Sequence, residues 1–191
     1  MSEDRFRKRG LAAPVYLPSL LITAAEGALL PILPVTAVGY GYSLAEAAVV
    51  TTVLMVGTMV FEIPASWITT KLGERRSMLL GTALGALSTL LAFLHLGYLS
   101  LIVAALGFGA AHSLFGLARH SLLAELVPPE HRPKSMSLLG GMFRGGMAIG
   151  PVIGSAFIAL YGVEFGYLAA GVMCLAAGAA VFSVPTTRLT T

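Results

Sequence analysis

Six long runs of apolar residues set the strongest limit on how this chain can fold. Each run has 18 to 26 residues, and a helix of that length, at about 1.5 Å per residue, crosses a hydrocarbon core about 30 Å thick. Because lipid offers the backbone no hydrogen bonds, runs of this kind must be helical. They cover residues 12–37, 44–69, 77–94, 99–124, 136–160 and 167–184.

The composition supports a membrane protein rather than a soluble one. Hydrophobic residues make up 57% of the 191 residues and charged residues 11%, roughly half the charged share of an ordinary soluble domain. A soluble chain of this size needs more polar surface to stay in solution. We therefore predict an all-α integral membrane protein, with a six-transmembrane-helix bundle over residues 12–184 between two tails, residues 1–11 and 185–191.

The basic residues predict how the bundle is oriented. Of the 12 Lys and Arg, all but Arg119 and Arg144 lie in the two tails or in the turns after the second and fourth runs. The three other turns carry none. By the positive-inside rule, this predicts a multi-pass protein of the cytoplasmic (inner) membrane with both termini in the cytoplasm. The net charge of +3 then follows from topology and does not indicate a nucleic-acid partner.

The sequence carries none of the common motifs of hydrolytic chemistry. It has no phosphate-binding loop, no nucleophile elbow and no His-x-x-x-His pair. Its one cysteine, Cys174, lies in the last run, so we expect neither a disulfide framework nor a cysteine metal site. We therefore predict a protein that is not an enzyme and needs no cofactor or metal.

Four stretches carry a family resemblance. The segments "PILPVTAVGYGYS" (31–43) and "LLAELVPPEHRPKS" (122–135) end the first and fourth runs. The turn after the second run contains Ser66, Thr70, Lys71, Gly73, Glu74, Arg75 and Arg76. The fifth run contains Gly146, Gly150, Pro151 and Gly154. Together these resemble the motifs of the major facilitator superfamily of secondary transporters.

The resemblance implies a fold and an activity. The six helices would form one half of a twelve-helix transporter, with helices one to three and four to six as an inverted pair. Such a protein moves a small molecule across the bilayer by alternating access. The glycine pattern of the fifth run resembles that of the superfamily's antiporters, which favours efflux.

The glycine pattern also predicts a packing surface. Gly146, Gly150 and Gly154 recur every four residues, so they share one helix face that another helix can approach closely. We expect Pro151 to bend the helix there. The resemblance implies that this face meets the other half of the transporter. The alternative is a contact within the same six-helix bundle.

The second turn departs from the family pattern. That pattern has Gly and Asp where this chain has Ser66 and Thr70, and in the family the Asp pairs with basic residues to latch the inner side. We expect the latch to be weaker or to have moved to Glu125, facing Arg75 or Arg76. Alternatively, the turn's basic residues, including Lys71 beside Gly73, only anchor it at the membrane surface.

Ionisable residues inside the runs cost about 2.5–3.5 kcal/mol each on insertion scales, so each is a functional candidate. They are Glu26, Glu62, His112, Arg119 and Arg144. Glu62 and Arg144 lie about 11 and 12 Å from the inner ends of their helices, so we expect them to pair, either to fix helix register or to gate. We expect Arg119 to extend toward the inner interface.

Proton coupling has three candidates, Glu26, Glu62 and His112. We count no basic residue at the depth of Glu26, so desolvation favours its neutral form and it is the first candidate to load and release a proton. A permanently protonated Glu26 bonded to the backbone is the alternative. His112 suits the same task or lines the cavity as a neutral residue.

The leading hypothesis is a secondary active transporter that exports a small molecule in exchange for protons. The rival is a half-transporter or truncated product, inactive alone, that serves as membrane partner of a second six-helix bundle, either its own copy or a separate half. A six-helix channel is a third idea, but no ring of charged residues supports it.

Overall fold

The apolar runs fold into helices over almost their whole length. The computed structural model describes residues 15–183, and the predicted tails, residues 1–11 and 185–191, lie outside this range. The helices are α2 (Leu17–Gly39), α3 (Leu44–Val60), α4 (Glu62–Leu72), α5 (Glu74–Phe93), α6 (Tyr98–Leu126), α7 (Arg132–Tyr161) and α8 (Val163–Phe182), with a short 3-10 turn, η2, at Pro129–His131. No strand occurs among the described residues, so the all-α prediction is confirmed.

The second predicted run is two helices rather than one. α3 and α4 meet at Phe61 at an angle of 47°. Pro64 lies three residues further on and has no N–H to donate to Val60 O, so the helical hydrogen bonds are interrupted at this point. The described chain therefore contains five helices long and apolar enough to cross a membrane, and a sixth span if α3 and α4 are counted together.

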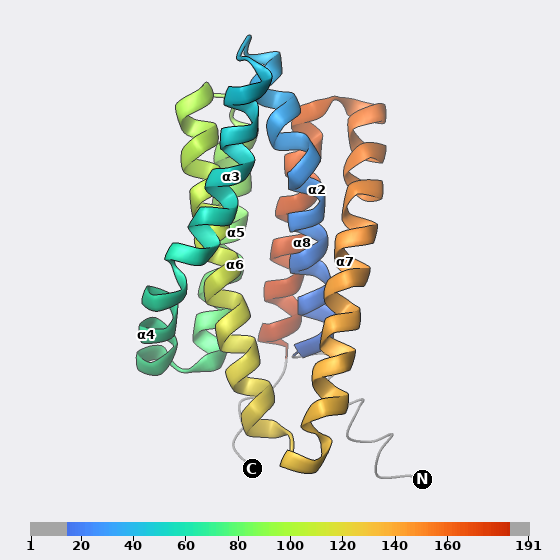
Figure 1. Cartoon of the computed structure of the whole chain (residues 1–191). Coiled ribbons are helices and arrows are strands. Elements are labelled where there is room, and N and C mark those ends of the chain that lie inside the picture. Colours follow the sequence, from blue (N-terminus) through green and yellow to red (C-terminus); the bar gives the residue numbers. More distant parts are fainter. Residues whose placement is uncertain (1–14, 184–191) are drawn as a thin grey trace.

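The helices stand roughly side by side, with α4 swung away from the bundle (Figure 1). α2 packs on α7 and α8, whereas α6 packs on α3, α4 and α5, and α5 joins the two groups through α8. Few contacts join α6 to α7. We call the end that carries the α4–α5 turn and η2 the basic end, because Lys71, Arg75, Arg76 and Arg132 lie there.

The glycine face of α7 is buried within the bundle, against α2. A side chain on Gly146 would overlap Thr23 Oγ1, and one on Gly150 would overlap Ala24 O. One on Gly154 would lie 3.1 Å from Ala28 Cβ. The expectation that this face meets another half is therefore wrong, and the contact within the bundle is the correct alternative. The close approach explains why glycine occupies these positions.

α2 contributes its own glycine to the same contact. A Cβ at Gly27 would lie 3.0 Å from Met147 O and 3.2 Å from Pro151 Cδ. Pro151 has no N–H, so Met147 O lacks its helical donor, and glycine at position 27 lets α2 approach that oxygen closely. α7 nevertheless continues through Pro151 as one helix to Tyr161.

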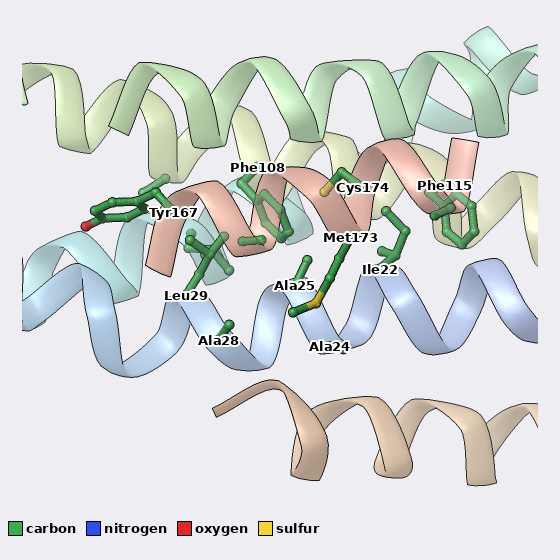
Figure 2. Close-up of a cluster of buried hydrophobic side chains, with 14 of the residues drawn as sticks. Ile22, Ala24, Ala25, Ala28, Leu29, Phe108, Phe115, Tyr167, Met173 and Cys174 are labelled. Atoms are coloured by element: carbon green, nitrogen blue, oxygen red, sulfur yellow. The ribbon is translucent and has the colours of Figure 1, made fainter. Parts of the chain in front are cut away.

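Side chains from α2, α6 and α8 fill the interior (Figure 2). Ile22, Ala25 and Leu29 of α2 meet Phe108 and Phe115 of α6 and Met173 and Cys174 of α8 there. Tyr167 is fully buried and donates a hydrogen bond of 2.6 Å to Thr36 Oγ1. This polar contact ties α8 to α2 near the end opposite the basic one.

Candidate functional site: a charged cavity between α4, α6 and α7

An open cavity of about 640 Å³ lies where α6 and α7 separate, in the half of the bundle nearer the basic end. Its volume is in the range of small-molecule sites. The lining residues are Thr58, Glu62, His112, Ser113, Gly116, Leu117, Arg119, His120, Met136, Leu139, Gly140, Phe143 and Arg144. Four of the five ionisable residues predicted inside the runs therefore share one cavity.

Glu26, the fifth, lies directly behind the cavity wall. Its Oε2 is 3.2 Å from His112 Nδ1, and its residue is 5% exposed. Neither of these two atoms has a hydrogen-bond partner elsewhere among the described residues. The expectation that Glu26 has no basic neighbour at its depth is therefore wrong, because α6 brings an imidazole from the cavity to the carboxyl group of α2. Proton transfer over this distance is feasible.

The imidazole of His112 is held between Glu26 and the cavity. Its ring also packs edge-on against Phe143 of α7, with ring centroids 6.5 Å apart. The same side chain thus contacts Glu26 on one side and lines the cavity on the other. His112 is thus the side chain that stands between the Glu26 carboxyl group and the cavity.

Arg119 is buried rather than extended to the interface. It is 5% exposed and lines the cavity, so the expectation that it reaches the membrane surface is wrong. Arg119 Nη2 lies 3.5 Å from His120 Nδ1, but His120 Nδ1 also lies 2.7 Å from Gly116 O. A carbonyl only accepts, so Nδ1 carries its hydrogen toward Gly116 and has no lone pair for Arg119.

The guanidinium of Arg119 thus has no carboxylate within ion-pairing distance among residues 15–183, and its Nε has no acceptor there. Its other contacts are with the Phe115 ring, 5.9 Å from the guanidinium carbon, and, beyond ion-pairing distance, an electrostatic attraction to the carboxyl group of Glu26. Leaving a buried charge without a partner typically costs about 3–5 kcal/mol. Solvent or a bound anion in the cavity would supply the acceptor that Arg119 Nε lacks.

Glu62 and Arg144 lie on the cavity rim and do not pair. Both line the cavity and both are exposed, yet no ion pair joins them in the part of the chain that the structure describes. The expected pair is therefore absent. Glu62 and Arg144 lie at similar depths along their helices, but these helices, α4 and α7, make no significant contact with each other.

The α4–α5 turn, which follows the second apolar run, makes contacts other than the predicted latch. Arg75 Nη2 donates to Phe182 O at 2.7 Å, and Ser121 Oγ donates to Glu74 Oε1 at 2.9 Å. No ion pair between Glu125 and Arg75 or Arg76 is present among the described residues, so the latch does not form there. Arg75 instead places its charge at the C-terminal end of α8, where the helix dipole favours a cation.

The remaining turn residues have local roles. Thr70 Oγ1 donates to Ser66 O within α4, and Lys71 Nζ lies 3.6 Å from the Trp67 ring centroid. Gly73 ends α4 with φ +80, a conformation that side chains disfavour, so glycine at this position is explained by the backbone.

His120 and Phe143 are cavity residues that sequence reasoning missed. The signal was present, because His112, Gly116 and His120 are four residues apart and therefore share a face of α6. Met136, Gly140 and Arg144 share a face of α7 in the same way. Helical periodicity gives these faces but does not say that they face each other.

Two comparisons with known proteins bear on this site. The family model for the Major Facilitator Superfamily matches residues 15–190. A comparison with curated proteins gave no match.

Proposed function

Because the chain belongs to the Major Facilitator Superfamily, whose members are membrane transporters of small molecules, we propose that it carries its substrate by alternating access and couples this movement to protons. The observation that supports the proposal best is the contact between Glu26 and His112 beside an open cavity. A buried acid joined to the cavity by an imidazole is a suitable arrangement for loading and releasing a proton.

The orientation and direction are part of the same proposal. The basic end carries the charged turns, so it would face the cytoplasm, with both termini on that side of the inner membrane. Lys71 over Trp67 would hold α4 at the headgroup level, where aromatic and basic residues are enriched. The glycine pattern of α7 resembles that of antiporters and supports export of the substrate.

A charge-neutral variant of Glu26 tests the proton coupling. In proteoliposomes with an imposed pH gradient, Glu26→Gln should abolish substrate-dependent proton movement, because the amide cannot release a proton at this position. Proton movement is followed with an entrapped pH-sensitive dye while candidate substrates are added. Glu130→Gln, an exposed carboxylate in η2, is the matched control and should behave like the unchanged chain. Unchanged coupling in Glu26→Gln would contradict the assignment.

The exposed charges on the cavity rim favour a second bundle. In lipid, Glu62 and Arg144 would each cost about 2.5–3.5 kcal/mol, so their faces must contact water or protein. Thr58, Ser66 and Thr70 continue the polar row of Glu62 along α3 and α4 at four-residue spacing. We propose that a second six-helix bundle, a copy of this chain or a separate half, covers this side and that the chain is inactive without it.

A further inference from the structure

The charges that reach the cavity are mainly positive. Arg119 and Arg144 line it beside the imidazoles of His112 and His120, and the one acidic side chain in the lining is Glu62. Glu26 attracts Arg119 electrostatically, but it lies beyond ion-pairing distance of Arg119, contacts His112 and does not line the cavity. Two permanent guanidinium charges thus face the cavity against one lining carboxylate.

Arg119 is the more buried of these two arginines, and part of its guanidinium lacks a hydrogen-bond partner. Arg119 is 5% exposed, and its Nε has no acceptor among the described residues. His120 offers it no lone pair. Arg144 stands across the cavity on α7 and forms no ion pair with a described residue. A planar guanidinium fork is well suited to hold a carboxylate or phosphate through two hydrogen bonds.

We propose that the substrate of this cavity is a small organic anion, with its carboxylate or phosphate group bound between Arg119 and Arg144. This inference rests on the proposed function, because it names the substrate class of the same site. Binding of the anion supplies the acceptor that Arg119 lacks and covers the charge of Arg144. The apolar lining, Leu117, Met136, Leu139 and Phe143, leaves room for the carbon skeleton.

Thermal unfolding of the full chain in detergent tests the proposal without any transport step. Cys174 is the single cysteine and is buried, so its reaction with a fluorogenic maleimide reports unfolding. The probes are succinate and glycerol phosphate as anions, putrescine as the cation and glycerol as the neutral compound, each at 10 mM (about tenfold above a millimolar Kd) and constant ionic strength. We expect at least one anion to raise the unfolding temperature by roughly 2–4 °C.

Arg144 is exposed, so its variants test anion binding without disturbing the buried core. Arg144→Gln should remove the stabilisation by anions, Arg144→Lys should retain part of it, and Lys134→Gln, which removes a charge from α7 outside the cavity lining, should leave it intact. Stabilisation by putrescine alone, no shift with either anion, or an anion effect that survives in Arg144→Gln would each overturn the proposal. Anion binding without proton-coupled transport would instead overturn only the proposed function.

Discussion

The hydroxyl of Tyr167 shows how one polar atom fixes two helices in an apolar interior. It donates to Thr36 Oγ1 at 2.6 Å, and Thr36 Oγ1 donates in turn to Ile32 O at 3.0 Å. Tyr167 is fully buried, so no water replaces the bond when it is lost. Interhelical hydrogen bonds in membrane proteins contribute about 0.6–1.7 kcal/mol.

Tyr167→Phe should therefore lower the free energy of unfolding by about 1 kcal/mol and the unfolding temperature by about 2–4 °C. The same thiol-reactivity measurement at Cys174 reports the change. Tyr161→Phe is the control, because Tyr161 is 61% exposed and no hydrogen bond of its hydroxyl is among those found for the described residues. Equal effects of the two substitutions would show that the bond to Thr36 contributes nothing.

At the scale of the elements, the contact between α2 and α7 depends on the absence of side chains. A Cβ at Gly150 would overlap Ala24 O and lie 2.8 Å from Ala28 N, and neither backbone atom can move without shifting α2. Gly150→Ala should therefore destabilise the protein by about 1–3 kcal/mol. Gly141→Ala, on the same helix with open space at its Cβ, should be neutral or slightly stabilising, because alanine favours helix. A matched loss in both variants would contradict this explanation.

The elements also show how far the sequence predicts the structure. The number and approximate bounds of the spans follow from the length of the apolar runs, because helix length must match the bilayer. The break at Phe61 was not predicted, although Pro64 is its visible cause. Prolines also lie inside α2 and α7 without dividing them, so a proline alone does not say which helix breaks.

The site was predicted as residues but not as contacts. All five ionisable candidates within the apolar runs lie in the cavity or directly behind it, since charge within an apolar run is a strong signal in itself. Their partners were wrong because depth along a helix does not give rotation about its axis. Glu26 meets His112 rather than remaining alone, and Glu62 and Arg144 share a rim without touching.

At the scale of the whole molecule, the faces left uncovered are more informative than those that are packed. The glycine row of α7 is buried against α2. The exposed face of α7 carries Arg144 and, three turns further along, Ser155. A step of 11 residues along an α-helix returns to nearly the same helix face. Small exposed residues, Ala148 and Ser155 among them, allow another helix to approach this face closely.

If a second copy covers this side, a cysteine at Ser155 should form a cross-linked dimer in native membranes, since the exposed face of α7 would then lie at the dimer contact. Denaturing gels after treatment with a short bifunctional maleimide would show the doubled mass. Leu175→Cys is the control, because Leu175 is 62% exposed on α8 beside α5 and away from the cavity. Buried Cys174 should not react in the folded protein.

The pattern of cross-links decides between the sources of the second bundle. A dimer through position 155 alone supports a pair of identical chains related by an axis along the membrane normal, the symmetry expected between halves of this superfamily. Equal cross-linking at 175 would mean random collision and would contradict a defined interface. With no cross-link at either position, this face does not pair with a second copy, and the particle mass by light scattering should then correspond to one copy of this chain.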